Sequence, residues 1–331
     1  MKIGLIDVDG RNYPNLALMK LSAWHKAQGD TVDWWWGFDH YDRVYMSRVF
    51  DDTYSQDVPA PLNADEIIKG GTGYVLRDRE GVLKLNRGNG WENAPPGGMR
   101  FGDIEYAELL PEEVEHTYPD YSLYPALTDG TAYGFLTRGC PKACHFCIVA
   151  GKEGRRSVKV ADLTEWRSEQ KNVVLMDPNL LACPQRMDLL GQLIDSRAWV
   201  DVNQGFDCRL LTTEVIGAIN RLKLKEIHFA WDYMKESEAV LRGLQLYTEY
   251  AIHKPHGQFG TVYTLTNYDT TMEENLYRIY TLRDMGFDSY VMIYDKPNAP
   301  QEIRDLQNWC NNRIIFRAEP DFSKYDRKRK Q

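Results

Sequence analysis

Short apolar runs near the N-terminus alternate with one segment of helical periodicity. Residues 3–8 and 31–36 have the continuous apolar character of buried strands, and residues 16–28 form an amphipathic pattern that Gly29 can end in a left-handed conformation. Two shorter apolar runs, at 43–47 and 66–69, lead into Gly70-Gly71-Thr72-Gly73. The pattern predicts a small, doubly wound α/β unit over residues 1–74.

The next segment, residues 75–128, loses this periodicity, and proline and glycine are dense at 93–98. A long stretch without a regular pattern inside a compact protein is usually functional. We therefore expect residues 75–128 to be an irregular linker or a cover over a pocket.

From residue 129 to 296 the strand and helix patterns alternate again. Helical patterns at 184–196 and 272–285 stand out, and Thr270 with Glu273 predicts a capping box for the second. Alternation of this kind implies a parallel sheet, and six units fall short of the eight of a closed TIM barrel. We expect an α/β fold with a partial (β/α)6 barrel, followed by a C-terminal helix and tail over 297–331. The six expected strands are 133–136, 173–176, 200–203, 226–230, 261–265 and 290–294.

Three cysteines follow the first of these strands, where functional residues of parallel α/β folds gather. Cys140, Cys144 and Cys147 lie in the segment RGCPKACHFC, and Phe146 precedes the last of them. Thiolates are the preferred ligands of iron-sulfur clusters, and three of them leave one iron of a cubane open. The alternative is a zinc site completed by His145, His228, His253 or His256, although no second CxxC or HxxxH pair occurs in the chain.

The CxxxCxxC spacing with its aromatic residue resembles the radical S-adenosylmethionine (SAM) superfamily over residues 131–294, in particular the branch with cobalamin-dependent enzymes and methylthiotransferases. The resemblance implies an enzyme in which Cys140, Cys144 and Cys147 bind a [4Fe-4S] cluster. SAM would bind the open iron and be cleaved by one electron to methionine and a 5′-deoxyadenosyl radical. A reductant such as flavodoxin or ferredoxin would supply that electron. The protein would orient the cofactors and exclude water.

The same resemblance suggests cofactor contacts after later strands. Asp177 and Asn179 match the place that receives the methionine end of SAM, although Asp177 before Pro178 also fits a turn or a helix cap. Arg209 matches an arginine that neutralises the SAM carboxylate, with an ion pair to Asp207 as the alternative. Asp232 stands where relatives carry a longer glutamate that contacts the ribose.

Other candidates have simpler interpretations. Tyr263, with Thr264 and Asn267, lies near the expected adenine and substrate pocket. Cys183 and Cys208 follow strand ends, but single buried cysteines usually behave as small apolar residues, and Cys310 is expected in the core of a late helix.

The first 74 residues resemble the cobalamin-binding domain that precedes the radical SAM core in that branch. The DxHxxG motif that supplies a histidine below cobalt is absent from the chain. Cobalamin is therefore an open alternative that is not favoured, and a cofactor-free domain that shapes the substrate pocket is the other. His25, Trp34, Trp35 and Trp36 would line that pocket or belong to the core.

Composition narrows the function. The 331 residues carry a formal net charge of -8, which opposes a broadly basic surface for nucleic acid, although the basic C-terminal residues can form a local patch. No apolar run approaches the roughly 20 residues that span a bilayer, and acidic residues follow the N-terminus, so a cytoplasmic protein without a membrane partner is expected. The six cysteines do not suggest a disulfide framework.

We therefore expect a radical SAM enzyme that acts on a small molecule or a peptide. The alternatives are an enzyme that modifies tRNA or nucleotides, which usually carries further cysteines and an RNA-binding domain, and a cobalamin-dependent methyltransferase. A non-catalytic metal scaffold would leave Asp177, Arg209 and Asp232 without a shared purpose.

Overall fold

The computed structural model describes residues 1–50, 54–75 and 110–326. By internal contacts the chain divides into two compact units, Met1–Pro178 and Asn179–Gln331. The predicted domain boundaries at 74, 128 and 296 differ from this division and stay a prediction. Most of the predicted irregular linker lies outside the described residues.

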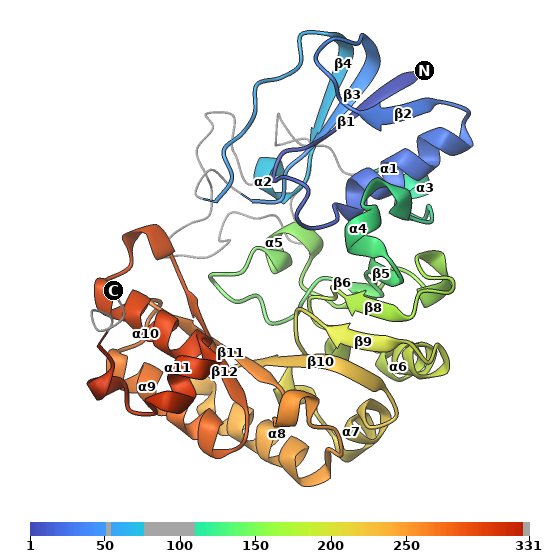
Figure 1. Ribbon diagram of the computed structural model, residues 1–331. Helices are drawn as coiled ribbons and strands as arrows, with labels where there is room; N and C mark the ends of the chain where they lie inside the picture. The colour runs from blue at the N-terminus through green and yellow to red at the C-terminus, as the bar shows by residue number, and fades with distance from the viewer. Residues whose placement is uncertain (51–53, 76–109, 327–331) are drawn as a thin grey trace. The chain divides into compact units, whose positions relative to one another are not determined.

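The N-terminal part of the first unit is a four-stranded sheet with the order β2-β1-β3-β4, in which every pairing is parallel. Strand β1 pairs with β2 and β3 over most of its length, and helix α1 packs on one face (Figure 1). The predicted doubly wound α/β unit is confirmed. Its elements are β1 (Lys2–Asp7), α1 (Leu16–Ala27), β2 (Thr31–Trp34), β3 (Tyr41–Ser47), β4 (Ala64–Gly70) and α2 (Thr72–Val75).

Apolar side chains cover both faces of this sheet. Leu18 and Leu21 of α1 pack against Ile3 and Leu5 of β1, while Tyr74 belongs to a second cluster with three side chains of β3. The Asn15 side chain caps α1 by accepting a hydrogen bond from the Leu18 backbone N–H at 3.2 Å.

His25, which the sequence offered as a pocket residue, is buried in this core. Its ring nitrogens bond the Asp30 carboxylate at 2.6 Å and the Tyr45 hydroxyl at 2.9 Å. Trp34 packs edge-on against Tyr124, whereas Trp36 is 60% exposed. Among these candidates the core interpretation holds for His25 and Trp34.

A six-stranded sheet follows, with the order β12-β11-β10-β9-β8-β5. The pairings of β5 with β8, β9 with β10, β10 with β11, and β11 with β12 are all parallel. All six predicted strands exist, and their ends differ from the predicted ones by three residues at most. They are β5 (Thr131–Gly134), β8 (Asn172–Leu175), β9 (Trp199–Val202), β10 (Lys223–Ala230), β11 (Thr261–Thr266) and β12 (Asp288–Ile293).

The first unit also holds the two short strands β6 (Thr137–Arg138) and β7 (Val158–Lys159), which pair antiparallel. Its remaining helices are short. They are α3 (Glu112–Glu115), η2 (Tyr121–Leu123), α4 (Pro125–Thr128), α5 (Val149–Glu153) and η3 (Leu163–Glu165).

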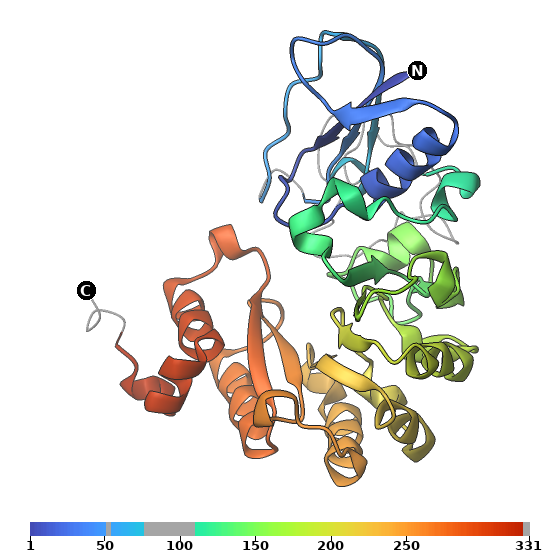
Figure 2. The same cartoon turned by 45° about the vertical axis from the view of Figure 1, so that its right-hand side comes forward.

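In the second unit, long helices lie along one face of strands β9 to β12 (Figure 2). Leu306 and Trp309 of the late helix α10 pack on Val291 of β12 and Ile279 of α9, and Cys310 lies in the same core as predicted. The helices are η4 (Leu180–Ala182), α6 (Arg186–Asp195), η5 (Cys208–Leu210), α7 (Thr213–Ile219), η6 (Met234–Glu236), α8 (Ser237–Tyr250), η7 (Pro255–Gly257), α9 (Met272–Asp284), η8 (Lys296–Asn298), α10 (Gln301–Asn311), α11 (Arg313–Ala318) and η9 (Phe322–Lys324).

The capping box of α9 is one residue later than predicted. Thr271, not Thr270, accepts from the Glu274 backbone N–H at 3.2 Å, and the Glu274 side chain accepts from the Thr271 N–H at 2.8 Å. Two consecutive threonines are followed by two consecutive glutamates, so the sequence fits either register.

Helix α8 approaches η5 at a glycine. A Cβ on Gly243 would collide with the Cys208 carbonyl oxygen, so only glycine permits this contact. Gly191 of α6 has no neighbour that a Cβ would meet within 4 Å.

We expect Gly243→Ala to destabilise the protein and Gly191→Ala to be neutral or stabilising. The first change forces backbone apart, whereas the second improves helix propensity by about 0.5–1 kcal/mol in open space. Urea denaturation of both variants measures the difference. Equal stabilities would contradict the close approach of α8 and η5.

Candidate active site

The three cysteines lie on one loop of the first unit, between β6 and α5. Cys140, Cys144 and Cys147 are half-buried, and the Cys147 N–H donates to the Cys144 carbonyl at 3.0 Å in a tight turn. Phe146 in this turn is also half-buried. The structure places the thiols after the carboxyl end of β5, as the sequence predicted.

This cysteine loop, residues 139–157, is closed at its base. Strands β6 and β7 pair Thr137 with Lys159 and Arg138 with Val158. The Cys140 N–H then donates to the Gly154 carbonyl at 3.1 Å, which continues the closure beyond the strands. The chain therefore enters and leaves the loop through this one pair of strands, residues 137–138 and 158–159, which we call the neck.

Glu153, on the returning side of the loop, bonds two consecutive residues on the entering side. Its carboxylate accepts from the Arg138 guanidinium at 3.0 Å and from the Gly139 backbone N–H at 3.2 Å. Gly139 has φ +81°, and a Cβ there would collide with the Arg156 carbonyl. A glycine is required at this position because the returning backbone passes so closely.

Asp177, directly after β8, bonds back to the start of the cysteine loop. Its carboxylate accepts from the Leu136 N–H at 2.9 Å, the Thr137 N–H at 2.6 Å and the Thr137 hydroxyl at 2.6 Å. Burial raises the pKa of Asp177 to about 7, while these donors act in the opposite direction. The predicted helix cap is supplied by Asn179 instead, which accepts from the Ala182 N–H at 3.3 Å.

The donor set of the loop fits an iron-sulfur cluster, since three thiols on one short segment are the ligands such clusters prefer. Among the described residues, no three Cys, His, Asp or Glu side chains are grouped as a metal site. His145, one of the suggested zinc ligands, is exposed on the same loop.

Two polar contacts join this region to the N-terminal sheet within the first unit. The half-buried Lys152 of α5 donates to the Thr72 hydroxyl at 2.7 Å, and desolvation lowers the pKa of Lys152. Glu115 lies 3.7 Å from Arg138 and 2.9 Å from Lys20 of α1. Neither contact was predicted from the sequence.

The glycines beside Thr72 have a local packing role. A Cβ on Gly71 would collide with the Arg48 carbonyl, and one on Gly73 would collide with the Phe50 carbonyl. These glycines allow the chain's own backbone to pass closely, so their presence does not by itself indicate a cofactor cradle.

In the second unit, Arg209 is held by two carboxylates. Its Nε and Nη2 donate to the two Asp207 oxygens at 2.6 Å each, and its Nη1 donates to Glu236. These contacts raise the pKa of Arg209 further above its ordinary value. The geometry is that of the predicted ion pair, so a role with the SAM carboxylate stays a prediction that requires a change of partners.

Arg278 of α9 is fully buried behind the ends of β10 and β11. It donates to the carbonyls of Trp231 at 2.6 Å, Asp232 at 3.1 Å and Leu265 at 2.7 Å. Burial lowers the pKa of Arg278 to about 10. Sequence analysis missed this residue, although a charged position between the apolar Leu276, Ile279 and Leu282 is a usable signal.

The remaining candidates of the second unit have structural partners. The Asn179 amide lies 3.5 Å from Asp207, and the Tyr263 hydroxyl donates to the Asn203 carbonyl at 2.9 Å while its ring stacks on His228. Cys183 and Cys208 are buried, and burial raises the pKa of Cys208 to about 12, which makes it a poor nucleophile.

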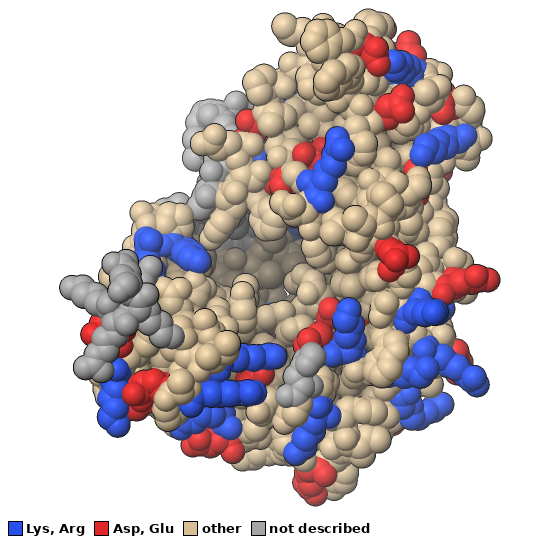
Figure 3. Space-filling view, in the orientation of Figure 1, with Lys and Arg blue, Asp and Glu red and all other residues tan. Residues whose placement is uncertain are grey.

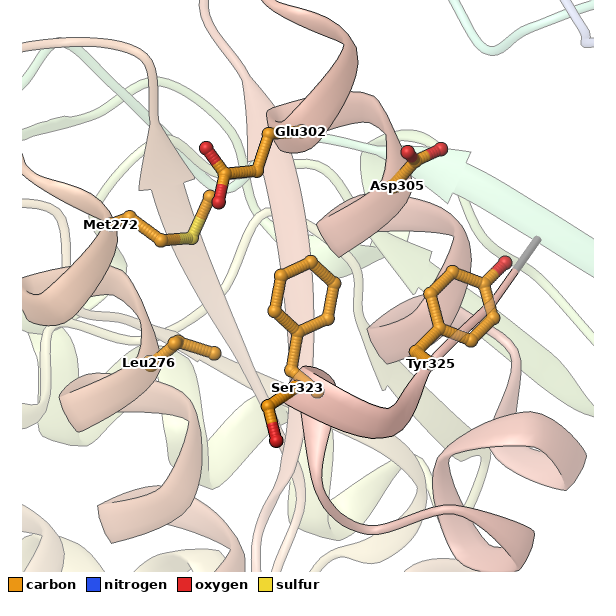
Figure 4. Close-up of a pocket in the computed structure, with 7 residues that line it drawn as sticks. Met272, Leu276, Glu302, Asp305, Ser323 and Tyr325 are labelled. Carbon is orange, nitrogen blue, oxygen red and sulfur yellow. The ribbon is translucent and has the colours of Figure 1, made fainter.

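A separate pocket of about 460 Å³ lies between α9, α10 and the C-terminal segment (Figure 4). It is lined by Met272, Leu276, Glu302, Asp305, Phe322, Ser323 and Tyr325. The pocket contains none of the predicted site residues.

Asp232 generates a pH-dependent prediction. Burial raises the pKa of Asp232 to about 6, whereas an unfolded aspartate titrates near pH 4. Between these values the folded chain holds one more proton than the unfolded chain, so the free energy of unfolding falls as the pH rises. We expect Asp232→Asn to reduce this fall by about 2 kcal/mol between pH 4.5 and 7.

Urea denaturation at the two pH values tests this expectation. Asp284→Asn is the matched control, because that carboxylate is 70% exposed, and it should retain the wild-type fall. The raised pKa of Asp177 contributes the same pH dependence of unfolding to the wild type and to both variants, so it does not alter the comparison. An unchanged pH dependence in Asp232→Asn would contradict the burial of this carboxyl group.

Comparison with solved structures gives a similar fold. One match is the radical S-adenosylmethionine methyltransferase TsrM from Kitasatospora setae, whose structure has cobalamin and a [4Fe-4S] cluster bound. It covers 88% of this chain and 74% of that chain, at a TM-score of 0.60 and 12% sequence identity. No protein-family model and no curated protein sequence matches the chain. The chain therefore has the fold of a radical SAM methyltransferase, an N-terminal parallel sheet followed by a partial barrel sheet, as the sequence predicted.

Proposed function

We propose that this protein is a radical SAM enzyme that cleaves SAM reductively at a [4Fe-4S] cluster bound by Cys140, Cys144 and Cys147. The observation that carries the proposal is the cysteine loop itself. Three thiols lie on one loop with a closed neck, after the first strand of a partial barrel sheet.

In this proposal the thiolates of Cys140, Cys144 and Cys147 would hold the cluster and leave it able to bind SAM. The bound cluster would supply the electron that breaks a sulfur-carbon bond of SAM. The protein's own part is to hold the thiolates, orient the substrates and exclude water. The neck bonds of Glu153 and Cys140 support the first of these tasks.

The proposed SAM contacts differ in how many existing hydrogen bonds each residue would have to give up in order to bind SAM. Asp232 offers a buried carboxyl group whose backbone is fixed by Arg278. Tyr263 offers the face of an aromatic ring already stacked on His228. Arg209 must exchange Asp207 or Glu236 for the SAM carboxylate, and Asn179 must leave its helix cap, so we rank both lower.

We propose a small molecule or a peptide as the substrate and a flavodoxin or ferredoxin as the electron donor. The net charge of -8 favours these over RNA. On the face shown in Figure 3, basic side chains are interspersed with acidic ones. No helix among the described residues is long and apolar enough to cross a membrane.

A second candidate is a cobalamin-dependent radical SAM methyltransferase. It is favoured by the coverage of the match, because 88% of the chain includes much of the N-terminal sheet. The histidines of this sheet region already have partners, since His25 bonds Asp30 and His40 pairs with Asp65. With no DxHxxG motif, we assign no residue to cobalamin.

Replacement of one cluster ligand tests the proposal. After anaerobic reconstitution and reduction, we expect wild-type protein to bind about four irons per chain and to form 5′-deoxyadenosine from SAM. Cys144→Ala should lose both, because the cubane would keep only two local thiolates. Cys310→Ala, which removes a thiol from the core of α10, should retain both.

Product analysis separates the candidates. Retained cleavage in Cys144→Ala, or no 5′-deoxyadenosine from a cluster-loaded wild type, would contradict the proposed reaction. Cobalamin that copurifies or binds stoichiometrically, with S-adenosylhomocysteine as a product, would favour the methyltransferase.

A further inference from the structure

We propose that Asp177 is a positioning residue for the cysteine loop, which it acts on through Leu136 and Thr137 and not by contact with SAM. The inference rests on the proposed cluster function and assigns a different task to a residue first considered as a SAM contact. It is carried by three hydrogen bonds from the end of β8 to the residues that begin the loop.

The carboxylate is already committed to these donors. One oxygen accepts from the Leu136 N–H, and the other accepts both the N–H and the hydroxyl of Thr137. Asp177 is 3% exposed, and Thr137 is fully buried. A group of SAM could reach this carboxylate only by displacing donors that would then be buried without partners.

The bonded residues lie just before the first cluster ligand. Thr137 also pairs with Lys159 in the neck, and only Arg138 and Gly139 separate it from Cys140. The position of the first thiol is therefore linked to the parallel sheet through Asp177, while Glu153 closes the loop on the other side.

This link matters because holding a loop in one conformation costs conformational entropy, and a fixed starting point reduces the amount that cluster binding must supply. Loss of the link should leave the ligands chemically intact but make the loop open more often. We therefore expect loss of the link to reduce retention of the cluster directly, and to reduce activity only as a consequence.

Three substitutions separate the contributions of the individual hydrogen bonds that the Asp177 carboxylate accepts. Asp177→Asn keeps the shape but offers one acceptor oxygen, and its amide N–H₂ faces a backbone donor. Thr137→Val removes only the hydroxyl bond, whereas Thr137→Ser keeps that hydroxyl. Asp129→Asn is the control, because this exposed aspartate precedes β5 and no hydrogen bond of its carboxylate is part of the neck.

Amide hydrogen exchange of residues 136–147 in the iron-free full-length chain measures loop opening. We expect about tenfold faster exchange in Asp177→Asn, a change equivalent to about 1.4 kcal/mol, which matches the cost of one unsatisfied buried group. Thr137→Val should show about threefold faster exchange. Thr137→Ser and Asp129→Asn should exchange at the wild-type rate.

Cluster loss provides the second readout. Reconstituted proteins are incubated anaerobically with an iron chelator, and the decay of cluster absorbance should follow the same order as the exchange rates. Wild-type exchange and cluster retention in Asp177→Asn would overturn the proposal. So would loss in Thr137→Ser equal to that in Thr137→Val, because packing rather than the hydroxyl bond would then be responsible.

The two proposals fail in different ways. If the wild type binds no cluster, the proposed function fails while the exchange measurement still reports on the link. If Asp177→Asn is unfolded by circular dichroism, the pair Thr137→Val and Thr137→Ser decides the matter alone. Equal behaviour of that pair then overturns the inference.

Discussion

The hydrogen bonds of the Asp177 carboxylate to Leu136 and Thr137 connect the parallel sheet to the segment that carries the cysteines. Most described residues of the cysteine loop are exposed or half-buried, and polar contacts join its two ends. Asp177 fixes where the chain enters the loop, and Glu153 joins the entering and returning strands. Asp177 thus connects the parallel sheet to the neck and the neck to the cysteines. Only Thr137, Arg138 and Gly139 lie between the carboxylate of Asp177 and Cys140, so a change at Asp177 should alter the position of Cys140.

The same loop is joined to the N-terminal sheet through buried or partly buried charges. Lys152 donates to Thr72, and Arg138 approaches Glu115, which also pairs with Lys20. A half-buried lysine is partly desolvated, and the Thr72 hydroxyl supplies an acceptor for the Lys152 ammonium. These contacts connect the cysteine loop to residues of α1, α2 and α3 within the first unit.

Prediction from sequence succeeded where the signal is periodic or local. The strands of the six-stranded sheet alternate regularly with helical patterns along the chain, and the CxxxCxxC spacing is a local pattern, so both were found. The capping box was displaced by one residue because Thr270-Thr271 and Glu273-Glu274 fit two registers. The partners of Asp177 are 40 and 41 residues away along the chain, and no local pattern encodes such a pairing. Arg278 was missed for the same reason, since its acceptors are backbone carbonyls of two other strands.

Two arginines of the second unit, the buried Arg278 and the half-buried Arg209, make contacts that the periodic pattern of the sequence does not encode. Arg278 donates to three carbonyls at the ends of β10 and β11, which would otherwise lack partners in a dry interior. Its charge faces the partly protonated Asp232, while Arg209 is balanced by Asp207 and Glu236. Such ion groups add little net stability after desolvation, but they fix backbone geometry with fork-shaped hydrogen bonds that a lysine cannot reproduce. The ends of β10 and β11 are therefore held by hydrogen bonds from one side chain to three backbone carbonyls, and not by apolar packing alone.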